Sequence, residues 1–298
     1  MKKKAIFEEG LSKGASLAGS AHSPAIEHYN RGVKYSQQGN FDLAIKQYTK
    51  AISLDAQLAL AYYNRGNAYG ANYFRKDVND QAIADYDQAI ALDAQDALAY
   101  NNRGIAYHLK GDYEEAIADF DQAIAIDLQL VMAHNNRGNA YCDRGVAHSD
   151  KGDLDRAIAD YDQAIALDPQ YALAYYNRGL TYADNGDYDR AIADYDQVIA
   201  LDPQNVFAYY YYDRGVAHAN KGDYDQAIAD YDQAIALDHP DADAYNGRGL
   251  AYYLKGDYDR AIADLERVLE LFLLPSARQD AEELLEEWRQ EKYRKQIE

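Results

Sequence analysis

Hydrophobic side chains along this chain recur with the spacing of α-helices rather than of β-strands. In residues 173–185, Tyr175, Gly179 and Tyr182 lie at offsets of 4 and 7, which places them on one face of a helix. A second apolar stripe follows and consists of Tyr188, Ala191, Ile192, Tyr195, Val198 and Ile199, and Pro203 ends it. Between the stripes, Gly186 suits a turn and Asp187 can cap the second helix through its carboxylate. The pattern predicts two antiparallel helices joined by a short turn.

This unit is repeated along the chain, and the dipeptide Arg-Gly marks each copy. It occurs at Arg31-Gly32, Arg65-Gly66, Arg103-Gly104, Arg144-Gly145, Arg178-Gly179, Arg214-Gly215 and Arg248-Gly249. The steps between these arginines are 34, 38, 41, 34, 36 and 34 residues, so a period of 34 with insertions of four, seven and two accounts for all of them. One helix pair cannot bury such a stripe alone, so we expect the copies to stack.

The glycine of each copy lies inside a helix, where it costs about 1 kcal/mol relative to alanine. Its recurrence implies a compensating contact. A small residue follows twelve positions later, as Ala191 follows Gly179, except where the four-residue insertion separates Gly66 from Ala82. We expect these small residues to lie at a helix crossing, with tyrosines filling the space alongside.

These residues together resemble the tetratricopeptide (TPR) repeat, which has an aromatic residue at position 4, Gly at 8, Tyr at 11, Ala at 20, an aromatic residue at 24 and Ala at 27. In the fifth unit they are Tyr175, Gly179, Tyr182, Ala191, Tyr195 and, in place of the last Ala, Val198. The resemblance implies an all-α fold, a right-handed α-solenoid of seven stacked antiparallel helix pairs. The units span about residues 25–58, 59–96, 97–130, 131–171, 172–205, 206–241 and 242–275. We expect a mobile N-terminal arm at 1–24 and a C-terminal capping helix at 276–298.

Two insertions interrupt the period. In the fourth unit, residues 141–148 closely parallel residues 211–218 of the sixth unit, so Arg144 takes the place of Arg214 and residues 135–141 form an extra heptad. Seven residues are nearly two helical turns, so the helix can lengthen and keep its face. The other insertion, within residues 70–80, predicts one more turn or a longer loop, with Phe74 either packed onto its own repeat or available to a partner.

The charge of the chain narrows the classes of partner. Its formal net charge is −20 and its pI is near 4.6, so it repels phosphate backbones and anionic lipid. We therefore expect no nucleic-acid partner and, because no run approaches about 18 apolar residues, no membrane insertion. The single cysteine, Cys142, excludes an internal disulfide and fits a reducing compartment. With no apolar run near the N-terminus, these features favour a cytoplasmic protein.

Residues that could carry catalysis do not form a catalytic pattern. The sequence contains no nucleotide-binding loop, no nucleophile elbow, and no His or Cys cluster with metal-ligand spacing. The acidic turn at residues 184–189 lacks the Gly and Glu of a calcium-binding EF-hand loop, so helix capping is the better interpretation. His148 and His218 fall at position 11 of their units and are expected to line the core. We expect no enzyme activity, no metal and no cofactor.

The resemblance also implies where a partner would bind. In the TPR family the first helix of each unit lines a concave groove, and positions 2, 5, 9, 12 and 13 usually contact ligand. Carried onto this chain, the partner-binding groove consists of Tyr29, Tyr63, Asn67, Asn101, Ile105, Cys142, Tyr176, Leu180, Tyr212 and Asn246. Asn amides can bond to an extended peptide, and Tyr supplies contact area at low entropy cost. The alternative is that these tyrosines only pack between adjacent repeats.

The predicted function is a protein–protein interaction scaffold or adaptor that binds a neutral to basic peptide segment or partner protein in this groove. The alternative is a structural assembly subunit that self-associates through repeat stacking without a peptide ligand. The Arg at position 7 stands where the family usually has Leu. We expect it to be structural, with its stem over apolar surface and its guanidinium on a nearby Asp. The rival interpretation is a row of cations that lines the groove for an acidic peptide.

Overall fold

The computed structural model describes residues 23–71, 78–148, 150–201, 203, 207–237, 242–271 and 275–297. The chain forms two compact units, unit 1 at residues 1–167 and unit 2 at residues 168–298, and each is described by itself. Helices joined by short turns make up the described residues, and none of these residues lies in a strand. The predicted all-α fold is therefore confirmed.

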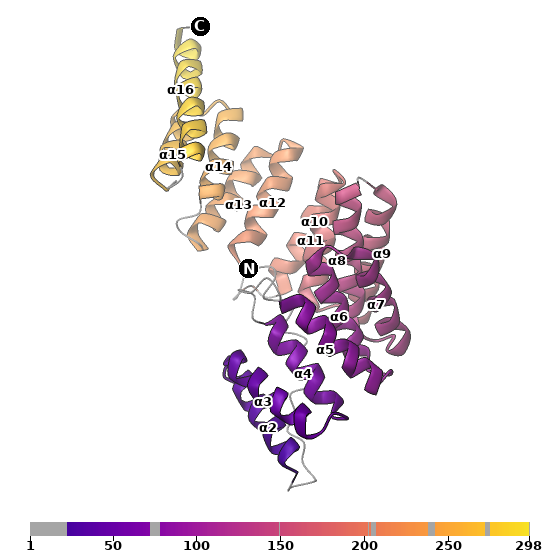
Figure 1. The fold of residues 1–298 in the computed structure, drawn as a ribbon. Helices are drawn as coiled ribbons and strands as arrows, with labels where there is room; N and C mark the ends of the chain where they lie inside the picture. Colours follow the sequence, from indigo (N-terminus) through magenta and orange to yellow (C-terminus); the bar gives the residue numbers. More distant parts are fainter. Residues whose placement is uncertain are drawn as a thin grey trace. The chain divides into compact units, whose positions relative to one another are not determined.

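Unit 1 contains four antiparallel helix pairs in which each helix packs against the next one along the chain (Figure 1). The first helices of the pairs are α2 (Pro24–Gln37), α4 (Ala59–Gly70), α6 (Ala97–Lys110) and α8 (Val131–His148). The second helices are α3 (Phe41–Leu54), α5 (Val78–Leu92), α7 (Tyr113–Ile126) and α9 (Lys151–Leu167).

Unit 2 contains three further pairs and a terminal helix, again with each helix packed on the next (Figure 1). Its first helices are α10 (Ala172–Asp184), α12 (Ala208–Lys221) and α14 (Ala242–Leu254), and its second helices are α11 (Tyr188–Leu201), α13 (Tyr224–Leu237) and α15 (Tyr258–Leu271). Helix α16 (Pro275–Ile297) follows. The seven predicted pairs and the predicted capping helix are all present among the described residues.

The turns within a pair are short because glycine ends one helix and aspartate begins the next. Gly222 has φ +86°, the left-handed conformation that favours glycine, and its N–H bonds to the carbonyl of Ala219 at 2.9 Å. At the start of α11, Asp187 accepts a hydrogen bond from the backbone N–H of Arg190 at 3.2 Å. The predicted capping role of Asp187 is confirmed.

The recurring glycine of the first helix leaves room for an aromatic ring of the second helix. A Cβ atom at Gly179 would lie 2.9 Å from Cε1 of Tyr195, a ring that is 1% exposed. The expected close contact therefore exists. Its partner is the tyrosine at position 24 rather than Ala191 at position 20, because the ring lies directly over the glycine.

The fourth helix pair has a different register from the predicted one. Arg137 holds both carboxylate oxygens of Asp160, at 2.8 and 2.5 Å, and a Cβ at Gly138 would lie 2.7 Å from the ring of Tyr161. Arg137-Gly138 thus occupies positions 7 and 8, and the assignment of Arg144-Gly145 to them was wrong. The extra residues lie at the other end, where they lengthen α8 and α9 at their shared turn. Consequently His148, expected in the core, is exposed.

Helix α16 closes the C-terminal end of unit 2 as predicted. Trp288 is 2% exposed and stacks on Tyr253, with ring centroids 4.9 Å apart. Arg289 reaches Glu266 of α15 at 2.7 Å. The predicted N-terminal arm falls outside the described residues up to residue 22, and so does most of the 70–80 insertion, including Phe74. In the portion of the chain that is described, no helix combines the length and apolarity needed to cross a membrane.

Candidate partner-binding surface

A row of arginine–aspartate pairs joins the two helices of the second to seventh repeats. In the third, fourth, sixth and seventh repeats the same arginine also bonds to the preceding repeat. Arg103 of α6 donates from Nε and Nη2 to the two carboxylate oxygens of Asp119 of α7, at 2.8 and 2.6 Å. Its Nη1 reaches Asp87 of α5, in the preceding repeat, at 2.5 Å. In the recurring Asp-Tyr-Asp sequence of the second helix, the first aspartate thus bonds to the arginine of its own repeat. The second bonds to the arginine of the next repeat.

The same two-sided arrangement recurs through both units. It is formed by Arg137 with Asp160 and Asp121, Arg214 with Asp230 and Asp196, and Arg248 with Asp264 and Asp232. Arg65 pairs with Asp85 but reaches Thr49 on the other side. The predicted contact of the position-7 guanidinium with an aspartate is confirmed in the second to seventh repeats. Arg31 of the first repeat is exposed instead, and Gln47 stands where the later repeats have this aspartate. A row of cations open to an acidic peptide is not available, because these guanidinium groups already hold carboxylates.

Burial and hydrogen bonding act in opposite directions on the charges of these pairs. The Asp119 side chain is 7% exposed, so desolvation raises its pKa, while the hydrogen bonds from Arg103 act in the opposite direction. The same bonds raise the pKa of the Arg103 guanidinium. Arg103 also lies over the ring of Tyr100, 5.5 Å from its centroid, which adds a cation–π contact.

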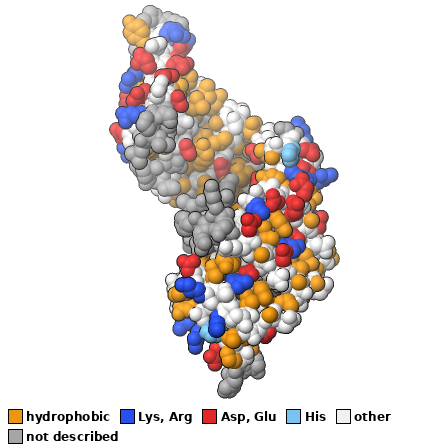
Figure 2. Space-filling view, in the orientation of Figure 1, with side chains coloured by type: hydrophobic (Ala, Val, Ile, Leu, Met, Phe, Trp, Pro, Cys, Tyr) orange, Lys and Arg blue, Asp and Glu red, His pale blue; other side chains and the backbone are white. Residues whose placement is uncertain are grey.

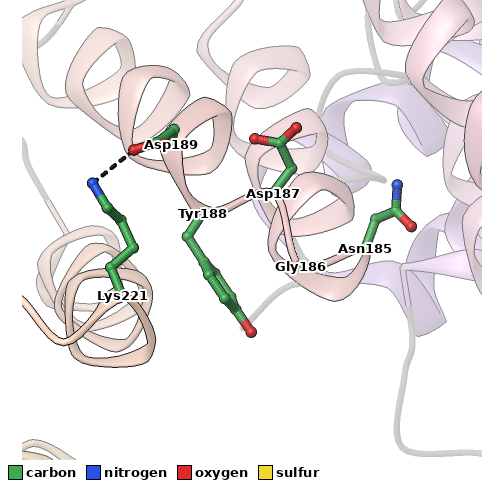
Figure 3. A pocket seen from close by; sticks show the side chains of 6 residues that line it. All are labelled: Asn185, Gly186, Asp187, Tyr188, Asp189 and Lys221. Atoms are coloured by element: carbon green, nitrogen blue, oxygen red, sulfur yellow. Dashed lines mark ion pairs between the residues drawn. The ribbon is translucent and has the colours of Figure 1, made fainter.

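A second row of ion pairs runs along the turns. Figure 3 shows the turn between α10 and α11, where Lys221 of α12 points toward Asp189; the two charged groups are 2.6 Å apart. Lys221 also lies 3.3 Å from Asp223. Lys110 and Asp80 form the corresponding pair in unit 1, at 2.8 Å. Figure 2 accordingly shows basic and acidic side chains next to one another on the visible face. The recurrence of these contacts from repeat to repeat indicates a structural role.

Positions 5 and 6 of the first helices form a buried polar row in unit 1. Asn102 donates from Nδ2 to the hydroxyl of Tyr63 at 3.1 Å and to Oδ1 of Asn67 at 2.9 Å. Asn136 donates in the same way to Asn101 at 3.1 Å. Each residue at position 6 thus bonds to position 5 of the preceding first helix, and the row sets the spacing between these helices.

This packing places six of the ten expected groove residues in the interior. Each is at most 3% exposed: Tyr29, Tyr63, Asn67, Asn101, Ile105 and Tyr176. Their side chains lie between helices. This arrangement agrees with the alternative interpretation, in which these residues pack between adjacent repeats. The sequence missed Asn102 and Asn136, although their recurrence directly before the position-7 arginine was a usable signal.

The register of the fourth pair also changes the assignment of Cys142. Because Arg137 is at position 7, position 5 is Asn135, which is 3% exposed. Cys142 lies one heptad further along α8, at position 12, and is half-buried. The assignment of Cys142 to position 5 is therefore corrected, and a step of 34 residues from Arg103 to Arg137 was the signal for the right register.

The remaining expected residues are accessible and lie together in unit 2. Position 9 is apolar in all three first helices, with Leu180 of α10 and Val216 of α12 half-buried and Leu250 of α14 48% exposed. At position 5, Tyr212 is half-buried and Asn246 is exposed. Because α12 packs against both α10 and α14, these side chains stand at equivalent positions of neighbouring first helices.

Aromatic rings continue this surface at the start of α12. Phe207 is 53% exposed and stacks on Tyr209, with centroids 5.4 Å apart. Tyr209 contacts Tyr176, whose hydroxyl donates to Asp213 at 2.6 Å. Burial and this carboxylate raise the pKa of Tyr176, so the phenol stays protonated. Neither Phe207 nor Asp213 was among the expected site residues, although the run of aromatic residues at 207–212 is visible in the sequence.

Solved structures with similar folds come from several sources. A tetratricopeptide repeat protein from Parabacteroides merdae ATCC 43184 has a TM-score of 0.63 and 17% identity, covering 89% of this chain and 99% of that chain. PilW, a type IV pilus biogenesis factor, has a TM-score of 0.65 and 20% identity, covering 75% and 98%. MamA from Desulfovibrio magneticus RS-1 has a TM-score of 0.52 and 23% identity, covering 59% and 94%. These similarities concern the fold alone.

No curated protein matches the chain. Family models, in contrast, match most of its length. Models described as tetratricopeptide repeat match residues 142–206, 212–281 and 95–170, and one described as TPR repeat matches residues 32–72 and 70–111. These matches coincide with the helix pairs, the glycine–tyrosine contacts and the stacking order described above. The chain belongs to the tetratricopeptide repeat family.

Proposed function

We propose that this protein is an interaction scaffold, and that the first helices of unit 2 bind a segment of a partner protein. The observation that carries this proposal is the accessible apolar row at position 9, formed by Leu180, Val216 and Leu250. Single exposed apolar residues are ordinary on a protein surface, whereas apolar residues that recur at the same position of neighbouring helices favour an interaction site. Tyr212 and Asn246 flank the row and can bond to a peptide backbone.

The polar surroundings favour a neutral to basic partner. Asp184 at the end of α10 and Asp243 at the start of α14 are both exposed, and the chain carries a net charge of −20. Rings such as those of Phe207 and Tyr209 attract cationic side chains through their faces. A segment with alternating apolar and basic side chains therefore suits this surface. Its charge would accelerate association, and its apolar side chains would supply most of the affinity.

Tyr176, a buried residue of the expected groove, supports the aromatic side chains of the proposed surface. Tyr176 contacts Tyr209 and Tyr210 from beneath, with centroids 5.3 and 5.0 Å away, and so holds the aromatic surface in place. In unit 1 the corresponding positions are occupied by the buried polar row. Unit 1 therefore offers less open apolar surface at positions 5 and 9 than unit 2 does.

The test is selection of peptides from a displayed random library on the purified full-length chain, followed by calorimetric titration. We expect the selected peptides to be rich in Lys, Arg and apolar residues. Leu250→Gln should weaken their binding about tenfold, the effect of losing about 1.4 kcal/mol. The matched control is Leu237→Gln on the second helix α13, since Leu237 is 52% exposed and belongs to the same unit.

Equal losses in the two variants, or a loss in the control alone, would refute the proposed surface. Selected peptides that are mainly acidic would refute the charge preference. If no peptide is selected and sedimentation shows concentration-dependent association of the chain alone, the assembly-subunit alternative takes its place. Helix α16 makes such stacking less favourable at the C-terminal end, because Trp288 and Arg289 already cover α15.

A further inference from the structure

Two stretches of nearly the same sequence adopt different hairpins in this chain. Residues 143–168 and 213–238 are identical except that Ser149, Asp150, Leu154 and Arg156 replace Ala219, Asn220, Tyr224 and Gln226. Most of the second stretch lies in α12 and α13, and most of the first lies in α8 and α9. Nearly the same sequence is thus found in two helix registers within one chain.

In the sixth repeat the hairpin has the register found in most repeats. Arg214 bonds to Asp230, sixteen residues later, and Gly215 faces Tyr231, whose Cε1 would lie 3.0 Å from a Cβ. Gly222 ends α12 in the left-handed conformation. The hairpin therefore turns at residues 222–223.

In the fourth repeat the same residues are displaced by one heptad. Arg144 bonds to Asp153, nine residues later, at 2.8 Å, and Gly145 faces Asp153 and Leu154 instead of Tyr161. Gly152, the counterpart of Gly222, lies in the first turn of α9. Arg137 and Gly138, seven residues upstream, instead face Asp160 and Tyr161.

We infer that the fourth repeat has two usable registers and that α8 can move along α9 by one heptad between them. In the register of the structure, Arg137-Gly138 faces Asp160 and Tyr161. In the other register, Arg144-Gly145 faces the same two residues, and the hairpin matches that of the sixth repeat. Displacement by seven residues nearly preserves the buried face, because seven residues are close to two helical turns.

The two registers satisfy different sets of contacts. The register of the structure gives Arg137 two carboxylates, since it also reaches Asp121 at 2.5 Å, and lets Asn136 continue the buried polar row. It leaves Val146 56% exposed and Ala147 exposed as well.

The other register would bury that apolar surface. The counterparts of Val146 and Ala147 in the sixth repeat are Val216, which is half-buried, and Ala217, which is 1% exposed. It would also give Arg144 the place of Arg137 beside Asp160. In both registers, an arginine lies beside Asp160 and a glycine lies beside Tyr161.

The movement would change the surface of unit 1. A heptad corresponds to about 10 Å along the helix axis. Positions 5 and 9 of the fourth repeat, now Asn135 and Asn139, would become Cys142 and Val146. This part of the first helix would thus become more apolar. Discrete helix displacements of this kind can switch an interface. This inference does not depend on the proposed function of unit 2.

The test is a distance measurement by electron paramagnetic resonance on the full chain. Spin labels are attached to Val146→Cys on α8 and Gln163→Cys on α9, two exposed positions, in a Cys142→Ser background. In the register of the structure, the two sites are offset by about 15 Å along the axis, and in the other register by about 5 Å. The parent protein should give mainly the longer distance.

Two variants shift the balance by different means. Arg137→Met removes the bonds to Asp160 and Asp121 without a steric clash, and should give a second, shorter distance. Gly138→Val places a branched side chain where a Cβ is already 2.7 Å from Tyr161, and should make the shorter distance dominant. The control is Arg103→Met in the third repeat, which has a single Arg-Gly pair and should leave the distance unchanged.

Persistence of only the longer distance in Arg137→Met overturns the inference, whether or not Gly138→Val folds. The inference also fails if Arg103→Met shortens the distance as much as Arg137→Met does, because the effect would then be a general loosening. A shorter distance in Arg137→Met that is absent from Arg103→Met supports the inference.

Discussion

Replacing Arg214 with Met should destabilise unit 2 by about 2–4 kcal/mol. Methionine keeps most of the stem that covers apolar surface but removes the charge. The Asp230 side chain is only 6% exposed and would lose both of its bonds to Arg214, at 2.9 and 2.5 Å. Breaking a buried pair by removing one partner costs about 3–5 kcal/mol. Arg214 itself is 20% exposed, so water reduces that figure.

The bond from Arg214 to Asp196 adds little to this total. The Asp196 side chain is 54% exposed, and an exposed pair contributes about 0–1 kcal/mol. The loss should nevertheless spread beyond one repeat, because Asp196 and Asp230 belong to neighbouring second helices, α11 and α13. Stabilities of stacked repeats are coupled through such interfaces.

The assay is urea unfolding followed by helical circular dichroism. The matched control is Arg260→Met, since Arg260 is 68% exposed and contacts Asp257 at 3.4 Å, and it should change the free energy of unfolding by less than about 0.5 kcal/mol. The double variant Arg214→Met with Asp230→Asn should recover part of the loss, because the uncompensated charge is gone. An Arg214→Met protein as stable as the control would refute the reasoning that the arginine row holds the repeats together.

Three further outcomes are expected. Gly179→Leu should cost about 1–3 kcal/mol or more, since a Cβ there already meets the ring of Tyr195 at 2.9 Å, and a melting temperature equal to that of the unchanged protein would contradict this. Trp288→Ala should cost about 3–5 kcal/mol and release α16 from Tyr253, which hydrogen exchange along residues 275–297 would detect. Burial lowers the pKa of His134, so the unfolded chain takes up a proton first as the pH falls through about 6.5, and stability should decrease. His134→Gln should have a flatter stability profile between pH 8 and pH 5, and an unchanged profile would argue against this origin.

The sequence was sufficient to predict the helix pairs and their stacking. The stripes from Tyr175 to Tyr182 and from Tyr188 to Ile199 lie within α10 and α11, because spacing along one helix determines which face is buried. The role of the position-7 arginine was also predictable, since many aspartates lie on the second helices. Both predictions depend on local pattern and composition.

Predictions that depend on contacts between helices were less successful. Arg137 and Arg144 both precede a glycine, and apart from the 34-residue step from Arg103 to Arg137, only the carboxylates around them in the fold distinguish one register from the other. In the same way, Tyr63 and Tyr212 share position 5, yet Tyr63 is fully buried and Tyr212 is half-buried. The difference arises from neighbours such as Asn102, which lies 39 residues from Tyr63 in the sequence.

The Asp-Tyr-Asp sequence has a consequence for how such a chain could grow. A typical repeat supplies one arginine and two aspartates. One aspartate bonds to the arginine of its own repeat, and the other bonds to the arginine of the next repeat, as Asp87 bonds to Arg103. A duplicated repeat can therefore be inserted anywhere in the row without leaving a buried ion unmatched. In the last repeat, Glu266 stands in place of the second aspartate and accepts a hydrogen bond from Arg289 of α16. Array length is thus free to vary, and the strong negative charge of the chain is a by-product that accumulates with every copy added.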